Sequence, residues 1–177
     1  MDSICLLGTG SYLPSTILTN YDLEESGLDT THEWIVKRTG VSQRRIAQAD
    51  ETVSDLGYQA SLKALEMAGL GAEEMDLIIM ATITPDTCCP SAANWLQAKL
   101  DATRAVTFDV TAACSGFIFG LNVAEQYLRN KTCKNVLVVA SEVMSRTLNW
   151  KDRSTCILWG DGAGAAVVTR EANTHQI

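Results

Sequence analysis

A nearly uninterrupted apolar run, residues 75–83, limits the possible folds of this chain more than any other stretch. A run of this kind suits a β-strand that is covered on both faces. Further short runs that lean toward strand lie along the whole chain, at residues 3–7, 105–110, 136–140, 156–159 and 163–169. The chain therefore has enough strands to build a sheet with a buried centre.

Segments with helical patterns separate these strands. The clearest is residues 52–68, whose apolar stripe is followed by Gly69 as a C-cap. Other helices are predicted at residues 19–27, 30–38, 91–100 and 114–128. Because strands alternate with helices, the expected class is α/β, with a mostly parallel mixed sheet flanked by helices.

Length and charge narrow the class of protein. The 177 residues suit one domain, and a net charge of −7 argues against nucleic acid as a partner. The sequence has no apolar run long enough to span a bilayer, and its N-terminus lacks the features of a signal peptide. We therefore expect a cytoplasmic protein that binds neither membrane nor nucleic acid.

Cysteine and histidine spacing argues against a metal site. The six cysteines form no C-x-x-C pair, and the two histidines are His32 and His175. Reduced thiols are the default in the cytosol. We interpret the adjacent Cys88 and Cys89 as part of loop packing rather than redox chemistry.

Two glycine-rich stretches resemble nucleotide-binding loops only superficially. Residues 8–10 (Gly-Thr-Gly) follow a strand, but no third glycine and no helix come after them. Residues 160–164 are followed by a strand-like run, so no helix N-terminus is offered to a phosphate. We expect these glycines to serve tight turns and close packing.

Cys114 lies where a predicted strand ends and a predicted helix begins. Unpaired N–H groups at a helix N-terminus favour thiolate over thiol, and a thiolate at such a turn is a nucleophile for acyl chemistry. Free cysteines are also commonly buried as structural residues. The local pattern alone leaves nucleophile and core cysteine equally open.

Several motifs together resemble one family. The matching segments, in chain order, are residues 8–14, 29–40, 51–54, 90–93, 109–117, 152–153 and 160–166. Across nearly the whole chain they resemble the N-terminal half of β-ketoacyl-acyl-carrier-protein synthase III, a condensing enzyme of the thiolase superfamily. The resemblance implies a layered α/β/α/β/α fold built from two similar halves. It also favours Cys114 as the nucleophile.

The resemblance further implies a reaction. Cys114 takes an acyl group from acyl-CoA, commonly acetyl-CoA, and condenses it with malonyl-acyl-carrier protein as carbon dioxide leaves. This reaction initiates fatty acid synthesis, uses no cofactor beyond the acyl-CoA substrate and takes place in a homodimer. The backbone N–H of Cys114 is expected to supply half of an oxyanion hole.

The same resemblance assigns a site for coenzyme A. Trp34 matches a tryptophan that stacks on adenine, Arg153 an arginine on its other face, and Arg38 a residue near the phosphates. Thr30 and Thr39 match polar residues of this site. Without the resemblance, Trp34 reads as a core residue and the arginines as solvated surface residues.

The chain departs from the family pattern in two ways. Cys89 stands where the family often has a phenylalanine that the dimer partner contributes to the acyl pocket, and Trp159 where a phenylalanine is common near the cysteine. The smaller residue at 89 would enlarge the pocket and the larger one at 159 would narrow another side, so a primer other than acetyl, branched or longer, is possible. In addition, the family's histidine and asparagine come from a C-terminal half, and neither His32 nor His175 matches that histidine motif.

We therefore expect residues 1–177 to be the N-terminal half of a synthase. The other half would belong to the same chain or to a second one. Without it, the strand at residues 163–169 is expected to expose apolar surface.

Other functions remain open. One is a starter-unit acyltransferase or synthase of a secondary pathway on the same fold. Another is a non-catalytic half-subunit of a condensing-enzyme complex, although a scaffold has no need of a thiolate. A thiolase-like β-oxidation enzyme fits the set of segments less well.

Overall fold

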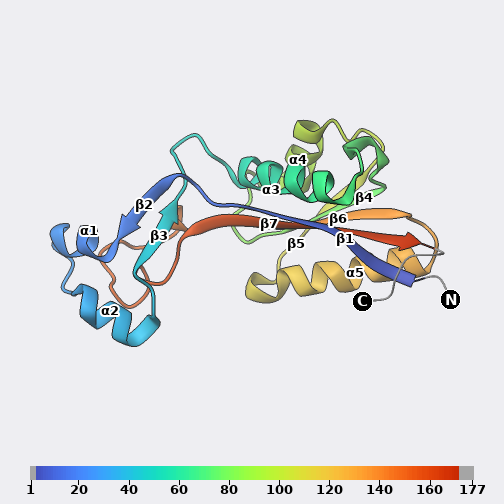
Figure 1. Ribbon diagram of the computed structural model, residues 1–177. Helices are drawn as coiled ribbons and strands as arrows, with labels where there is room; N and C mark the ends of the chain where they lie inside the picture. Colours follow the sequence, from blue (N-terminus) through green and yellow to red (C-terminus); the bar gives the residue numbers. More distant parts are fainter. Residues whose placement is uncertain (1–2, 172–177) are drawn as a thin grey trace.

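A computed structural model of the chain describes residues 3–171. Its centre is a five-stranded sheet in the order β1-β7-β6-β4-β5 (Figure 1). The strands are β1 (Ser3–Tyr12), β4 (Leu77–Ala81), β5 (Val106–Val110), β6 (Asn135–Val143) and β7 (Asp161–Glu171). The apolar run at residues 75–83 forms β4, which is completely buried between its two neighbours.

The sheet is mixed. β4 pairs parallel with β5 and with β6, whereas β7 pairs antiparallel with β6 and β1. Parallel pairing is thus confined to β6-β4-β5, and the sheet is less parallel than the alternation of strands and helices suggested. The predicted mixed sheet flanked by helices is confirmed. Since the parallel strands end at one edge, the segments that follow them meet there.

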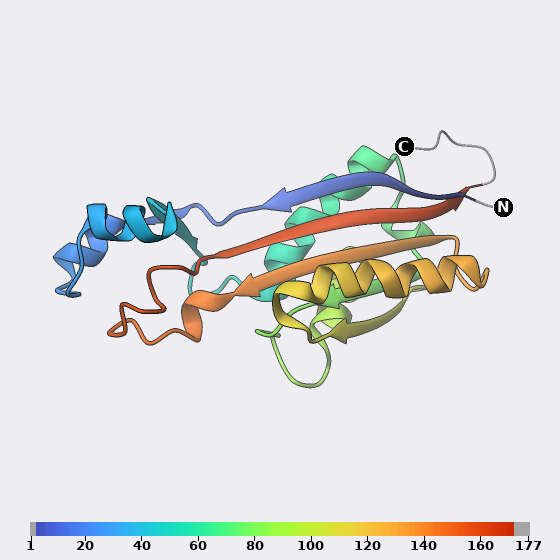
Figure 2. The ribbon, with the colours of Figure 1, turned by 90° about the horizontal axis from the view of Figure 1, so that it is seen from below.

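Helices cover both faces of the sheet (Figures 1 and 2). α3 (Val53–Ala68) and α4 (Ala92–Leu100) lie on one face, and α5 (Gly116–Arg129) lies on the other. Thr52 and Ser91 cap the first two through reciprocal bonds with Asp55 and Asn94. Three short 3₁₀ helices, Ala72–Glu74, Ala113–Ser115 and Met144–Arg146, lie in the connections.

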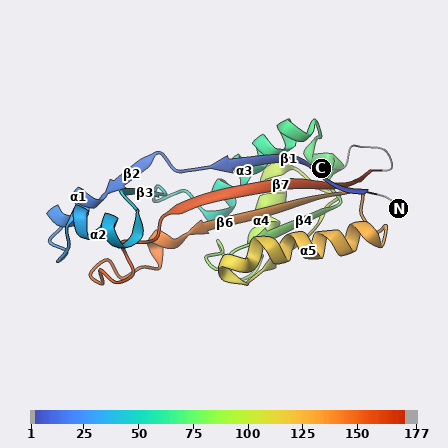
Figure 3. The same cartoon turned by 60° about the horizontal axis from the view of Figure 1, so that its bottom comes forward.

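A small second unit projects from one end of the sheet (Figures 1 and 3). It consists of β2 (Thr16–Thr19), α1 (Asn20–Glu25), α2 (His32–Thr39) and β3 (Gln43–Ile46). β2 and β3 form an antiparallel pair that the sequence analysis did not predict. We call these elements the outlying unit.

A buried arginine holds the outlying unit together. The Arg44 guanidinium donates to the carbonyl of Leu18, to Oδ1 of Asn20 at 2.9 Å and to the carbonyl of Ile157 at 2.8 Å. Burial lowers the pKa of Arg44 from its ordinary value. Since Ile157 comes from the segment before β7, this one side chain ties the unit to the rest of the molecule.

Three expectations need correction. Residues 156–159 form a turn rather than a strand, and Cys156 and Ile157 are buried because they pack under the outlying unit. β7 exposes no apolar stripe: residues 165–168 are buried, since neighbouring strands and helices cover them. The thiols of Cys88 and Cys89 are both exposed, so they do not pack within their loop.

The two glycine motifs have structural roles. A Cβ at Gly10 would overlap the backbone of Ala60, so glycine lets α3 lie directly against β1. In the second motif, the buried carboxylate of Asp161 accepts from the backbone N–H of Ala47 at 2.7 Å and from both N–H and hydroxyl of Ser145. The motif thereby joins β7 to two distant loops.

No helix within residues 3–171 combines the length and apolar character needed to cross a bilayer.

Candidate active site

Cys114 lies at the start of α5, in the short 3₁₀ helix that follows β5. Ala113, the residue before it, has a φ of 46°, a left-handed conformation uncommon for a residue with a side chain. A Cβ on Gly116 would stand 3.0 Å from the Ala81 side chain, so glycine allows the helix start to lie against the end of β4. The thiol of Cys114 is exposed, which removes the core-cysteine interpretation.

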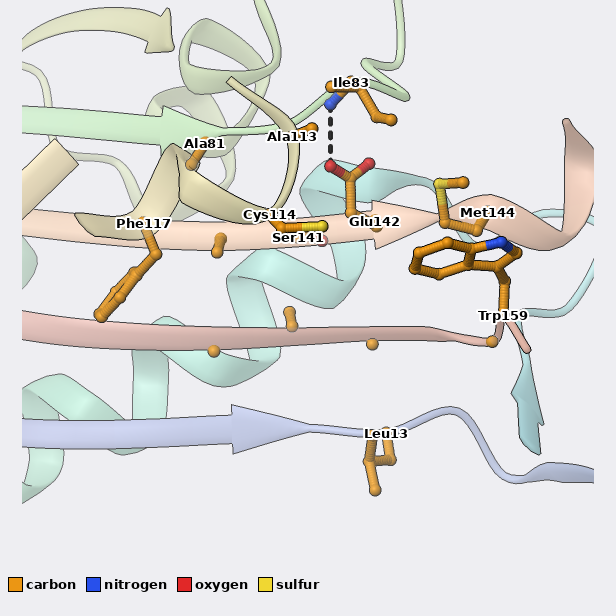
Figure 4. Close-up of a pocket in the computed structure, with 15 residues that line it drawn as sticks. Leu13, Ala81, Ile83, Ala113, Cys114, Phe117, Ser141, Glu142, Met144 and Trp159 are labelled. Carbon is orange, nitrogen blue, oxygen red and sulfur yellow. Dashed lines mark hydrogen bonds between the residues drawn. The ribbon is translucent and has the colours of Figure 1, made fainter. Parts of the chain in front are cut away.

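A cavity of about 610 Å³ opens beside Cys114 (Figure 4). Segments from the ends of β4 and β6, from β7 and from α5 line it. Its larger apolar side chains are Leu13, Ile83, Phe117, Met144 and Trp159. The cavity is mostly apolar, and such a site suits an alkyl or acyl group attached to the thiol.

Among the described residues that line this cavity, Glu142 carries the charge and the others are uncharged. Its carboxylate accepts from the backbone N–H of Ile83 at 2.9 Å, from the hydroxyl of Thr82 at 3.1 Å and from the hydroxyl of Thr84. Figure 4 shows the carboxylate turned toward Ile83, next to Cys114 and Met144. All three donors come from the segment that directly follows β4.

A second group of predicted residues comes together on the outlying unit. The guanidinium carbon of Arg38 lies 4.3 Å from the centroid of the Trp34 ring, and that of Arg153 lies 4.8 Å away. Arg153 also donates to the backbone carbonyl and to the carboxylate of Asp29. The half-buried Trp34 thus carries two cations at cation–π distance.

The two threonines of the predicted coenzyme A site differ in their bonding. The hydroxyl of Thr39 donates to the carbonyl of Ile35 at 2.8 Å and accepts from the N–H of Val41 at 3.0 Å, which closes the end of α2. The hydroxyl of Thr30 is buried without a hydrogen-bond partner in the described part of the chain. The Thr30 oxygen is thus both without a partner and covered by its own surroundings.

The acyl-pocket residues also separate. Trp159 lines the cavity next to Cys114, as expected. Cys89 lies on the exposed loop between β4 and α4 and is not among the residues that line the cavity.

Sequence reasoning missed several cavity residues. Phe117 lies three positions after Cys114, so helical spacing was a usable signal for it. No sequence signal marked Leu13, Glu142 or Met144, because only the packing of β1, β6 and β7 brings them to Cys114. Within residues 3–171 no group of three or more metal-ligating side chains occurs. His175 lies outside the described residues.

The fold and the exposed cysteine at a helix start define a thiolase-like protein. A family model described as 3-oxoacyl-[acyl-carrier-protein] synthase III matches residues 108–177. A β-ketoacyl-[acyl-carrier-protein] synthase III from Caldanaerobacter subterraneus subsp. tengcongensis is 54% identical over 172 residues, covering 97% of this chain and 52% of the relative.

Solved structures agree with the sequence matches. The 3-oxoacyl-[acyl-carrier-protein] synthase III from Aquifex aeolicus superposes with a TM-score of 0.93 at 49% identity, covering 97% of this chain and 55% of that one. The priming β-ketosynthase of the R1128 polyketide pathway gives a TM-score of 0.93 at 40% identity, covering 97% and 51%. Over nearly its whole length the chain is similar to the N-terminal part of β-ketoacyl-acyl-carrier-protein synthases III. It spans about half the length of the curated relatives it matches.

Proposed function

We propose that Cys114 is the nucleophile of a β-ketoacyl-acyl-carrier-protein synthase III whose N-terminal half is residues 1–177. One observation carries the proposal: the exposed Cys114 thiol stands at the start of α5 and at the mouth of an apolar cavity. An exposed thiol in that position can attack a thioester, and the cavity can receive the acyl chain that remains attached.

The proposed reaction has two stages. The Cys114 thiolate attacks the acyl-CoA carbonyl, the backbone N–H of Cys114 supports the oxyanion, and coenzyme A leaves as its thiolate, which takes a proton from water. Malonyl-acyl-carrier protein then loses carbon dioxide, and its carbanion attacks the acyl-cysteine carbonyl. The cysteine sulfur leaves as thiolate, which restores the enzyme and releases β-ketoacyl-carrier protein.

We assign coenzyme A recognition to Trp34 and the two arginines around it. Adenine stacks on an indole face, and a guanidinium can cover its other side. Arg153 now lies over Trp34 itself, so the base would enter between the two side chains. Arg38, which lies over the Trp34 ring, would pair with phosphate in this proposal. Thr30 is assigned to the same site as a neighbouring polar residue. Thr39 contributes by closing the end of α2.

The rest of the synthase supplies what these residues lack. The histidine and asparagine that support decarboxylation belong to the C-terminal half in our proposal, as does the surface that binds the carrier protein. The outer side of α5 offers a place for that half, because Ile118 and Phe119 are 63% and 53% exposed there. We expect a cytoplasmic homodimer in which Cys89 reaches the partner's acyl pocket.

A second function remains in view because the cavity is large and apolar. A cavity of about 610 Å³ has room for a primer longer than acetyl, and a priming β-ketosynthase of a polyketide pathway shares the fold at 40% identity. Relative transfer rates from acetyl-, butyryl- and isobutyryl-CoA separate the two functions. A preference for acetyl supports initiation of fatty acid synthesis.

The test is mass spectrometry of the whole protein that contains this chain, after mixing with acetyl-CoA. We expect the mass of one acetyl group on the Cys114 peptide, lost again when malonyl-carrier protein is added. Cys114→Ala is the control that should stay unmodified. If the unvaried protein takes up no acyl group from any of the three thioesters, the proposed function is wrong.

A further inference from the structure

The segment after β4 leaves the sheet but stays attached to β6 through side chains. β4 ends at Ala81, where its ladder with β6 stops. Beyond that point Glu142 takes the place of the ladder, since its carboxylate receives the N–H of Ile83 and the hydroxyls of Thr82 and Thr84. Ile83, held in this way, forms part of the cavity wall.

The connections form a closed network. Thr84 donates its hydroxyl to Glu142 and accepts from the backbone N–H of Val143 at 3.0 Å. Thr82 donates to the same carboxylate and accepts from the backbone N–H of Thr84 at 3.1 Å. Since each hydroxyl both gives and receives, removal of the carboxylate leaves three donors without this acceptor, one of them the N–H of the cavity residue Ile83.

We propose that Glu142 is a positioning residue that fixes the Ile83 wall of the Cys114 cavity and thereby sets which chain lengths the cavity accepts. Glu142 acts on the loop rather than on the reacting atoms, because its carboxylate bonds are directed to the segment after β4. The inference rests on the proposed function in one respect, which is that Cys114 is the reactive residue.

The experiment measures chain-length selectivity without acyl-CoA. Alkyl methanethiosulfonates transfer their alkylthio group to a thiolate, forming a disulfide and releasing methanesulfinate. The whole protein is treated with the methyl and the hexyl reagent, and mass spectrometry follows the rate at the Cys114 peptide. Reading that peptide alone separates Cys114 from the exposed Cys88 and Cys89.

We expect Glu142→Ala to raise the hexyl-to-methyl rate ratio about threefold or more, since a loosened wall admits the longer chain. Glu142→Gln keeps one oxygen for the Ile83 N–H, so its hexyl-to-methyl rate ratio should lie between those of the unvaried protein and Glu142→Ala. Glu125→Ala is the matched control: its carboxylate pairs with Arg129 on the surface of α5, and the ratio should not change.

The outcomes separate the two proposals. If Glu142→Ala keeps a native circular dichroism spectrum and the unvaried ratio, Glu142 is only structural and the inference is wrong. If that variant does not fold, Thr84→Val decides, because it deletes one bond to the same carboxylate: an unchanged ratio overturns the inference, and a raised one supports it. A raised ratio in a protein that takes no acyl group from acyl-CoA leaves the inference standing and removes the proposed function.

Discussion

The two candidate sites of this molecule rest on very different supports. Cys114 stands on the sheet, where α5 packs against the buried strands β4 and β6. Trp34 stands on the outlying unit, whose own core is a small cluster around Leu23 and Ile35. The contrast suggests a division of labour in which the rigid sheet holds the reacting atom and a small unit binds the remote end of the substrate.

Replacement of the thiol is the sharpest way to separate the two sites. Cys114→Ala should reduce acyl transfer by about 10³-fold or more, because no other group at the cavity can form the thioester. Coenzyme A should still bind, as Trp34 and the arginines are untouched. Single-turnover transfer and calorimetry measure the two effects. A variant that loses both together would contradict the division.

Removal of Arg44 should weaken only the outlying unit. Arg44→Leu leaves three acceptors without their donor, and we expect a cost of about 3 kcal/mol in local stability. Hydrogen exchange should speed up in residues 16–46 and stay slow in β4 and β6. Arg104→Leu, at an exposed arginine, is the control with little expected effect. Equal loosening of the sheet would mean that the two regions are one cooperative unit.

Loss of the indole should affect binding alone. Trp34→Ala is expected to weaken acetyl-CoA binding by about 1–3 kcal/mol, the usual value for stacking on a base. The rate of Cys114 alkylation by iodoacetamide should not change. Trp95→Ala removes an exposed tryptophan on α4, away from this site, and serves as the control. Unchanged affinity by calorimetry would overturn the assignment of Trp34.

A smaller effect should appear in acid, in the part of the sheet region that Asp55 links. Burial raises the pKa of Asp55, whereas hydrogen bonds from Lys99 and Thr52 and the charge of Lys99 lower it. The lowering effects together are the larger, so the pKa of Asp55 lies below its ordinary value. The stability that this carboxylate contributes is therefore present above its unfolded pKa of about 3.9 and is lost as the pH falls through the folded value.

Asp55→Asn should flatten that loss. Because the pair is partly exposed, the difference should be under about 1 kcal/mol. Urea midpoints of both proteins between neutral pH and pH 3 measure it. Parallel curves for the two proteins would show that the Asp55–Lys99 link between α3 and α4 contributes nothing.

Much of this protein follows from local sequence. Apolar runs give β4 and β6, the caps at Thr52 and Gly69 give the bounds of α3, and the change of pattern at Cys114 gives the start of α5. These features depend on neighbours a few residues apart, so short-range pattern is enough to predict them. The motif match added Trp34, Arg38 and Arg153 as a group.

Tertiary structure decided what long-range packing brings together. Three features join residues that lie far apart in the chain. They are the antiparallel pairing of β7 with β1 and β6, the hydrogen bonds between Glu142 and the segment after β4, and the placement of Leu13 beside Cys114. The hydrophobic periodicity of the sequence does not predict such long-range contacts, because they depend on which faces of the helices and strands become buried against each other. The sequence by itself indicated most of the secondary elements and the position of Cys114 at a helix start, whereas packing of the sheet determined the cavity around that thiol.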